Sequence, residues 1–307
     1  MDGKPLNPNS WIRKFDLMTL RLFLSTKEEG NIQRASTRER IAASAVTRRI
    51  QELEETLGFQ LLYRDPKGTT LTDAGHAVAR CAETVMRAIE TMRSDLSELS
   101  GTVQGNIRVW TTESVLVEFL ADDIGRFIAA NPAVDIELQE DQSTNIFRAV
   151  SAARADIGLC AEPSEPVPGL VTFRYRTDQL VAVMVPEHPL STRASVSFAE
   201  LLDADLIGWV DTSALMRSLE QAAISMNREF KPRYRVTSPE GARSLVHAGL
   251  GVSIQPEGMV RPQDAFASVP LNDPWATRKL SIYVQEGRQL PLAARKLIEY
   301  LSPESVV

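Results

Sequence analysis

The feature that most constrains this chain of 307 residues is a run of helix, turn and strand signals between residues 32 and 75. At its centre, residues 42–58 carry apolar side chains at steps of four, three and four, which place them on one face of a helix. These residues are Val46, Ile50, Leu53 and Leu57. Gly58 then supplies the residue type that most often ends a helix in a left-handed conformation. The spacing predicts a bounded helix with a polar opposite face.

The residues after this helix predict a basic β-hairpin. Residues 61–64 and 69–71 favour strands, and Asp-Pro-Lys-Gly at 65–68 favours a tight turn. Arg64 and Lys67 flank that turn. A helix, a turn, a second helix and a hairpin in this order are typical of a winged helix-turn-helix, which binds double-stranded DNA.

The basic residues of this region are concentrated where DNA would lie. Between residues 31 and 50 there are five arginines and one acidic residue, Glu39. In a recognition helix the N-terminal residues reach base edges, while basic neighbours contact phosphate. Each of these side chains taken singly is also compatible with a solvated surface position. The candidate DNA-binding residues are Arg34, Ser44, Thr47, Arg48, Arg49, Arg64 and Lys67.

Residues 20–77 resemble, without a gap, the N-terminal domain of LysR-type transcriptional regulators. The resemblance is carried by Gly30, Asn31, Ile32, the pair Ala35-Ser36 and the run Ala-Ala-Ser-Ala-Val-Thr-Arg at 42–48. Two positions depart from the family pattern. Ala42-Ala43 replaces the common Ser-Gln, which leaves the operator sequence open. Glu39 replaces a buried Leu, so we expect it to turn outward or to pair with Arg38 or Arg40.

A long amphipathic helix is predicted over residues 73–100. Its apolar residues alternate in steps of four and three, which is the seam of a coiled coil, and they are Val78, Ala82, Val85, Ile89, Met92, Leu96 and Leu99. Such a helix would be about 40 Å long. It could pack along its own chain, but its length favours pairing with a second copy. The family resemblance also implies a dimerisation helix here, and we expect a dimer that assembles further into a tetramer.

Composition narrows the remaining functions. The net charge of −6 hides an asymmetry, because residues 1–100 hold 15 basic and 14 acidic residues and the remainder holds 19 and 26. Nucleic acid binding is therefore expected only in the N-terminal part. Cys81 and Cys160 are too few for a disulfide framework or a metal site, and we expect no cofactor. Without a signal peptide or a long apolar run, a cytoplasmic protein with no membrane partner is expected.

From residue 105 onward, strands and helices alternate. Strands at 107–110, 134–138 and 155–159, with helices at 114–130 and 146–153 between them, predict a parallel sheet. This rhythm is similar to the effector domain of the same family, which has two α/β subdomains and the fold of a periplasmic binding protein. We therefore expect a winged helix-turn-helix at 15–75, a dimerisation helix at 73–100 and an effector domain at 105–307. Subdomain I would span about 105–161 and 282–307, and subdomain II about 162–281.

Polar residues follow several of these strands and predict an effector site. The junctions after residues 111 and 141 are places where helix N-termini offer free N–H groups, although serine and threonine also serve there as ordinary caps. The resemblance implies effector contacts from both junctions. The candidates are Thr112, Ser114, Gln142, Ser143, Thr144, Asp211, Thr212 and Gln255. Glu113 would oppose an anionic effector, and Trp110 stands where a small residue is common and would narrow the pocket.

These observations predict a DNA-binding transcriptional regulator controlled by a small-molecule effector. Its partners would be an operator in double-stranded DNA, the effector, further copies of itself and RNA polymerase. The alternative is a small-molecule binding or transport-related protein without a transcriptional role, which the basic N-terminal region disfavours. An enzyme is not expected, because the sequence has no phosphate-binding loop and no nucleophile motif, and its three histidines are widely spaced.

Overall fold

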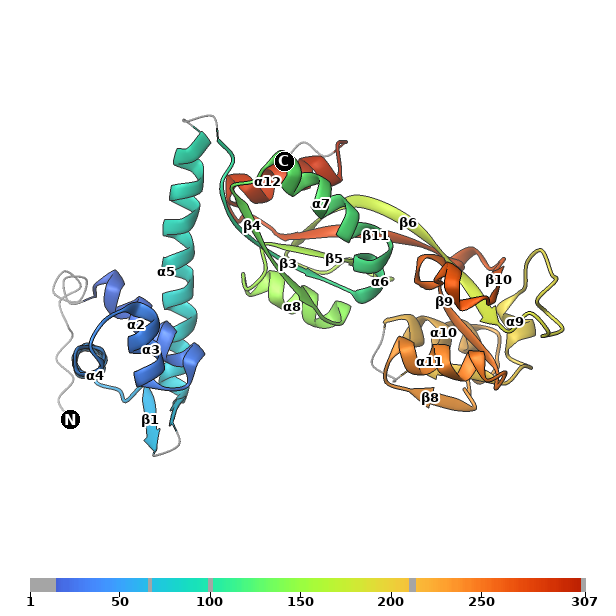
Figure 1. Ribbon diagram of the computed structural model, residues 1–307, viewed down its shortest axis with the longest axis horizontal. Helices are drawn as coiled ribbons and strands as arrows, with labels where there is room; N and C mark the ends of the chain where they lie inside the picture. Colours follow the sequence, from blue (N-terminus) through green and yellow to red (C-terminus); the bar gives the residue numbers. More distant parts are fainter. Residues whose placement is uncertain (1–14, 66–67, 99–101, 210–213, 305–307) are drawn as a thin grey trace. The chain divides into compact units, whose positions relative to one another are not determined.

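The computed structural model describes residues 15–65, 68–98, 102–209 and 214–304 (Figure 1). The chain forms two compact units that divide between Arg93 and Ser94. None of the helices in the described part of the chain is both long and apolar enough to cross a membrane.

Three helices, a hairpin and most of a long helix make up the N-terminal unit. They are α2 (Leu17–Glu29), α3 (Ile32–Glu39), α4 (Ala43–Leu57), β1 (Leu62–Asp65), β2 (Gly68–Leu71) and α5 (Asp73–Glu98). Asp16 and Asn31 cap α2 and α3 by accepting hydrogen bonds from backbone N–H groups. The predicted helix at 42–58 is confirmed, and Gly58 ends it with a φ of 73°. This arrangement is the predicted winged helix-turn-helix.

The core of this unit is built from the apolar faces of its helices. Val46, Ile50 and Leu53 of α4 are buried and pack against Leu22 and Phe23 of α2 and against the start of the hairpin. The turn between α3 and α4 is tight, since Arg40 has a left-handed φ of 55° and donates its N–H to carbonyls of α3. The core and this turn together fix the angle at which α4 presents its opposite face.

Glu39 pairs with a residue that the sequence analysis did not propose. Its carboxylate Oε2 lies 2.6 Å from Nε of Arg21 on α2, and its side chain is 7% exposed. Arg38 instead binds Glu28 and Glu29. The expectation that Glu39 turns outward or pairs with Arg38 or Arg40 is therefore wrong. The charge is accommodated because α2 crosses α3 close enough for Arg21 to cover it.

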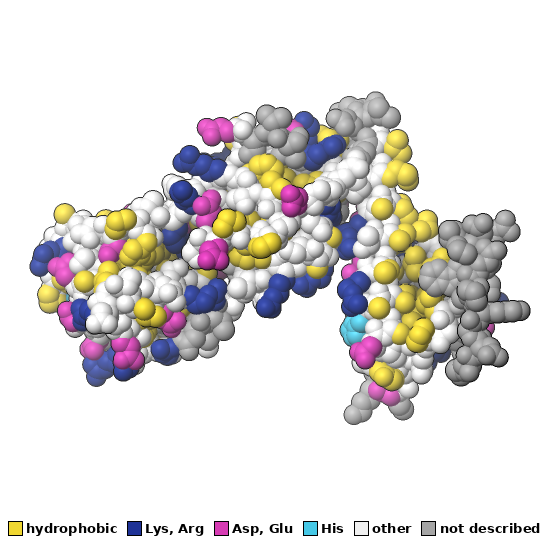
Figure 2. Space-filling view, turned by 180° about the vertical axis from the view of Figure 1, so that it is seen from behind, with side chains coloured by type: hydrophobic (Ala, Val, Ile, Leu, Met, Phe, Trp, Pro, Cys, Tyr) yellow, Lys and Arg dark blue, Asp and Glu magenta, His cyan; other side chains and the backbone are white. Residues whose placement is uncertain are grey.

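Only the first part of the predicted seam on α5 is covered within one chain. Val78 packs against the core of the N-terminal unit, and Ala82 is buried. Further along, Val85, Met92 and Leu96 are 40%, 56% and 57% exposed, and Figure 2 shows hydrophobic side chains along the length of this helix. Leu99 lies outside the described residues. A long apolar stripe thus remains uncovered in the single chain.

The C-terminal unit is built on one continuous set of strands in the order β4-β3-β5-β11-β6-β9-β7-β8, with β10 beside β6. The strands are β3 (Gly105–Thr111), β4 (Val134–Glu140), β5 (Ile157–Ala161), β6 (Leu170–Met184), β7 (Leu206–Trp209), β8 (Tyr234–Val236), β9 (Val252–Pro256), β10 (Ala267–Pro270) and β11 (Thr277–Gln285). As predicted from the alternation, β4, β3 and β5 run parallel. The strands β8, β7 and β9 repeat this parallel arrangement.

Helices cover the sheet and connect its strands. They are α6 (Glu113–Val115), α7 (Ala121–Ala130), α8 (Ser143–Ser151), α9 (Phe198–Leu201), α10 (Ala214–Ser225), α11 (Pro239–His247) and α12 (Leu292–Leu301), with short turns at η1 (Leu116–Leu120), η2 (Glu257–Met259), η3 (Pro262–Asp264) and η4 (Pro274–Ala276). The single helix predicted over 114–130 is interrupted, because η1 is a π-helical turn between α6 and α7.

The unit has two main cores, and β6 belongs to both. Tyr175 of β6 packs in the first core with Leu280 of β11, whereas Leu180 packs in the second core with Ala276. We call the parts around these cores subdomain I and subdomain II. By these cores, the first division falls between residues 175 and 180, later than the expected residue 162, and the second falls between residues 276 and 280, close to the expected residue 281. The first half of β6 stays in subdomain I because it pairs with β11.

Candidate functional site

The exposed face of α4 carries the first group of predicted residues. Ser44 is exposed, Thr47 is half-buried and the Arg48 side chain is 73% exposed. Among the described residues, Arg48 forms one ion pair, a 3.7 Å contact from Nε to Glu52 one turn later. An exposed pair of this kind contributes little to stability. Arg48 is therefore able to reach a ligand at little cost.

Arg49, the next residue, is held within the protein. Its Nη1 lies 3.1 Å from Oδ2 of Asp16 and 3.2 Å from Oγ1 of Thr19. Burial acts to raise the pKa of Asp16, but hydrogen bonds from Thr19 and the charge of Arg49 hold it below its ordinary value. Arg49 therefore ties α4 to the N-terminus of α2, and its position relative to Arg48 is set by that contact.

Two further predicted residues flank α4. The Arg34 guanidinium donates to the backbone carbonyl of Glu29 and is 68% exposed. Arg64 of the hairpin lies 3.3 Å from Glu54. The Glu54 carboxylate also accepts hydrogen bonds from the N–H groups of Leu61 and Leu62, at 2.7 and 3.2 Å. The hairpin is thus fastened to the end of α4, while Lys67 lies outside the described residues.

A cleft in the C-terminal unit holds the second group. It consists of two adjoining cavities of about 330 and 970 Å³, which share Ser143, Ala161, Ala214, Leu215 and Arg278. Thr112, Ser114, Gln142 and Ser143 line the smaller cavity. They converge because β3 and β4 are parallel neighbours, with Thr111 opposite Glu140, so the segments after both strands leave the same sheet edge.

The remaining predicted effector residues have different outcomes. Thr144 lines the larger cavity with Ser143. Gln255 is buried and does not line either cavity, although its neighbour Pro256 does. Asp211 and Thr212 lie outside the described residues. Trp110 lines neither cavity, since it packs beside a separate cluster around α8 under the Arg154 guanidinium. The expectation that Trp110 narrows the pocket is therefore wrong.

Arg278 is the main cleft residue that the sequence analysis missed. It lines both cavities, and its Nε donates to Oδ1 of Asp178 at 2.8 Å while Nη2 bonds to Oδ2. Asp178 is fully buried at its side chain. The two residues are 100 positions apart on β11 and β6, so no local motif joins them. The pair fixes the Arg278 guanidinium in the wall of the cleft, with its charge neutralised by Asp178.

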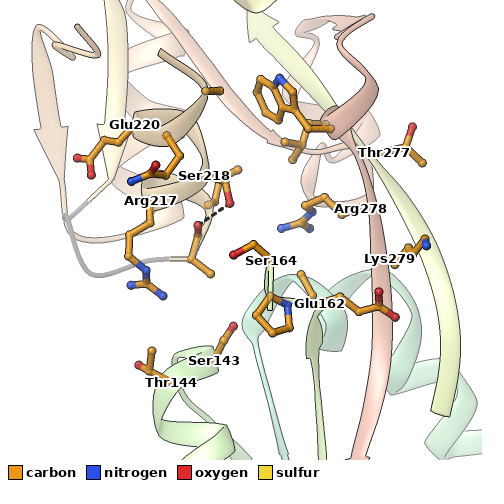
Figure 3. Close-up of a pocket in the computed structure, with 18 of the residues that line it drawn as sticks. Ser143, Thr144, Glu162, Ser164, Arg217, Ser218, Glu220, Thr277, Arg278 and Lys279 are labelled. Atoms are coloured by element: carbon orange, nitrogen blue, oxygen red, sulfur yellow. Dashed lines mark hydrogen bonds between the residues drawn. The ribbon is translucent and has the colours of Figure 1, made fainter. Parts of the chain in front are cut away.

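The two cavities differ in charge. Glu113, Glu140 and Asp141 line the smaller one, and burial together with the charge of Glu140 raises the pKa of Glu113. In the larger cavity, Figure 3 shows the Arg217 side chain extending from α10 toward the end of α8 that carries Ser143 and Thr144. An effector would thus meet hydroxyl groups at the junction, mainly acidic groups in the smaller cavity and groups of both charges in the larger one. The described residues contain no cluster of side chains that could hold a metal ion.

A helix-turn-helix with an exposed polar helix face, joined in one chain to an α/β unit with a polar cleft, defines a class of ligand-responsive DNA-binding regulators. Comparison with known families agrees. Residues 17–76 match the model described as bacterial regulatory helix-turn-helix protein, lysR family, and residues 100–305 match the LysR substrate binding domain. The chain belongs to the LysR family of transcriptional regulators, with a DNA-binding helix-turn-helix and an effector-binding domain.

Individual relatives are distant. The HTH-type transcriptional activator IlvY of Salmonella typhimurium is 26% identical over 79% of this chain and 82% of its own length. IlvY of Escherichia coli K12 is 27% identical over the same shares. Among solved structures, full-length CbnR complexed with its target DNA has a TM-score of 0.71 at 18% identity, covering 95% of this chain and 100% of that one. Full-length OxyR from Pseudomonas aeruginosa has a TM-score of 0.71 at 19% identity, covering 94% and 93%.

Proposed function

We propose that this regulator reads its operator with the N-terminal half of α4 and responds to a small polar metabolite bound in the cleft between subdomains I and II. The observation that carries the proposal is the convergence of Thr112, Ser114 and Ser143 on one cavity that Arg278 also lines. The DNA-binding half of the proposal rests on the exposed face of α4.

On the DNA side, we assign base contacts to Ser44, Thr47 and Arg48, which lie on the exposed part of α4. Arg34 and the hairpin residues Arg64 and Lys67 would contact phosphate. Arg49 would act by positioning α4, because its ion pair with Asp16 would have to break before it could reach DNA. CbnR, which has a similar fold, has been solved in complex with its target DNA.

On the effector side, the lining favours a polar molecule over a simple anion. Arg278 is already neutralised by Asp178, and the carboxylates of Glu113 and Glu140 would repel a negative group in the smaller cavity. Hydroxyl groups accept and donate hydrogen bonds equally well. The effector would therefore place hydroxyl, amide or amine groups beside Thr112 and Ser114. Any acidic group would lie in the larger cavity near Arg217.

For assembly, we propose a dimer paired through the exposed stripe of α5 and a tetramer built from two such dimers. Two recognition helices in a dimer would address two half-sites of an operator. RNA polymerase is the further partner expected of such a regulator, and the cytoplasm is its expected location.

Two measurements test the proposal. Footprinting of the full-length protein on the DNA flanking its own gene should show protection of a site with two related halves. A thermal-shift screen of small metabolites should find a stabilising compound, because a ligand that binds only the folded state raises its stability. That stabilisation should decrease in Ser114→Ala. The absence of any protected site would overturn the proposed DNA binding. A compound that stabilises the protein equally well after Ser114 and Thr112 are replaced would overturn the assignment of the cleft.

A further inference from the structure

One contact between subdomains I and II is made by the side chain of Glu118. Glu118 lies on η1 of subdomain I, and its side chain packs against Gly258 on η2, which follows β9 in subdomain II. A Cβ atom added to Gly258 would come within 2.2 Å of the Glu118 side chain. The contact therefore requires a residue without a side chain at position 258.

This carboxyl group has few hydrogen-bond partners. The backbone N–H of Gly258 donates to it, but Oε2 is buried and has no hydrogen-bond partner among the described residues. A buried charge without donors costs much more free energy than a buried neutral group. The surroundings of Glu118 thus penalise its ionised form.

Of the three charged groups that face Glu118, two raise its pKa, as burial does, and Arg278 lowers it. Asp178 on β6 and Glu257 on η2 are acidic, and the one facing cation, Arg278 on β11, is bound by both oxygens of Asp178. Arg176, also on β6, binds Asp123 instead. Burial first, and the charge of Asp178 second, raise the pKa of Glu118 to about 7. Arg278 is therefore already paired with Asp178 and only weakly offsets a negative charge on Glu118.

We propose that Glu118 is a proton-controlled contact between the subdomains, closed when its carboxyl group is neutral and loosened when it ionises. Arg278 links this contact to the cleft, since it faces Glu118 and lines both cavities. A change of pH around neutrality would therefore alter the shape of the effector site. The inference goes beyond the proposed function and does not depend on the identity of the effector.

The raised pKa of Glu118 determines whether the contact is tighter at lower or at higher pH. A carboxyl group that binds its proton more tightly in the folded protein stabilises the fold most below its ordinary pKa of 4.5. That contribution is lost as the pH rises through the folded value of about 7. The contact should accordingly be tighter on the acidic side of neutrality.

The test measures the distance between the subdomains in the full-length protein. Spin labels on Glu137→Cys of subdomain I and Thr192→Cys of subdomain II, both exposed, report that distance when exposed Cys81 is replaced by serine. Labelled protein is diluted with unlabelled protein so that only pairs within one chain contribute. Between about pH 6 and about pH 8, we expect the distance distribution to broaden and shift. Glu118→Gln should keep the narrow distribution at both pH values.

Controls separate this contact from general titration and from misfolding. Glu187→Gln makes the same chemical change at an exposed position and should respond as the wild type does. Gly258→Ala should show, even at the lower pH, the broadened and shifted distance distribution that the wild type shows at the higher pH. Circular dichroism checks that this variant folds. An infrared band of a protonated carboxylic acid should appear at the lower pH in the wild type and be absent from Glu118→Gln. The proposal would be overturned if the distance distribution of the wild type did not change with pH, or if that of Glu118→Gln did.

Discussion

Two adjacent arginines on α4 have different surroundings and should have different roles. Arg48 is exposed, whereas Arg49 bridges to Asp16 and Thr19. If Arg48 contacts a base, Arg48→Ala should weaken operator binding by about 1–3 kcal/mol and leave urea unfolding unchanged. Arg49→Ala should instead lower the stability of the N-terminal unit. Titration of operator DNA with each variant, alongside unfolding curves, distinguishes the two roles. Equal DNA binding by Arg48→Ala and the wild type would contradict the assignment.

Asp156 should make the C-terminal unit sensitive to acid. Its buried carboxylate binds both Arg108 and Arg288. Burial acts to raise its pKa, but hydrogen bonds and charge from Arg108 hold the pKa below its ordinary value of 3.8. This stabilisation is present above pH 3.8 and is lost as the pH falls through the lowered pKa.

The corresponding variant removes one partner of a buried ion pair. Asp156→Asn should cost about 3–5 kcal/mol at neutral pH, because two arginines lose their carboxylate, and should lose less stability on acidification than the wild type. Urea unfolding at neutral pH and at acidic pH measures both effects, with exposed Asp135→Asn as the control. An acid response of Asp156→Asn as steep as that of the wild type would show that other groups cause it.

Single residues also show where sequence reasoning stops. Thr112, Ser114, Gln142 and Ser143 could be predicted to line a site because each lies in the short segment after a strand. Arg278 could not, because its role depends on Asp178, which meets it only after β6 and β11 have paired. The partner of Glu39 was missed for the same reason, since Arg21 reaches it from another helix.

At the scale of elements, the hairpin depends on the end of α4. Glu54→Ala removes the acceptor for the N–H groups of Leu61 and Leu62 and the partner of Arg64. Leaving such donors unpaired costs about 1–3 kcal/mol. Urea unfolding should show this loss, while exposed Glu55→Ala on the same helix should have little effect. Similar curves for both variants would mean that the hairpin is held by its apolar contacts alone.

The stripe on α5 predicts assembly. If Val85, Ile89 and Met92 are covered by a second copy, Ile89→Asp buries an unpaired charge in the dimer, which costs about 3–5 kcal/mol. Sedimentation should then detect monomers that bind a two-half-site operator weakly. Ala88→Asp places the same charge beside the stripe and should remain assembled. An unchanged oligomer in Ile89→Asp would show that the stripe is not the interface.

Periodicity predicted most of the elements, and two of the features that it missed have clear physical reasons. The π-helical turn at 116–120 carries no glycine or proline that would signal a break, so residues 114–130 appeared as one helix. The first half of β6 was missed because its alternating charged residues resemble an exposed segment. It became a strand because β11 supplies hydrogen bonds along it, and such pairing over 100 residues is invisible to a local pattern.

At the scale of the whole molecule, effector response and DNA binding should separate. Ser114 and Thr144 line cavities in the C-terminal unit, and Arg48 belongs to the N-terminal unit. Removing a hydrogen-bond partner of a buried ligand costs roughly 1–3 kcal/mol. Ser114→Ala or Thr144→Ala should thus raise the effector concentration needed for a response by about ten-fold or more, with operator affinity in the absence of effector unchanged.

Promoter response and operator affinity, measured in the same variants, test this separation. Exposed Thr192→Ala should match the wild type in both assays. A full response with both hydroxyl groups removed would mean that they serve only as helix caps. A loss of operator affinity in either variant would show that the two units depend on each other before any effector binds.

The pairing of β6 with β11 limits how the C-terminal unit can move. Residues 170–179 of β6 are hydrogen-bonded to β11, and both strands run from subdomain I into subdomain II. Sliding one strand by one residue would turn every side chain to the opposite face, so translation is blocked. Twisting of a two-stranded ribbon preserves its hydrogen bonds. The subdomains should accordingly rotate about this ribbon, and Arg278, as part of it, would turn in both cavities at once.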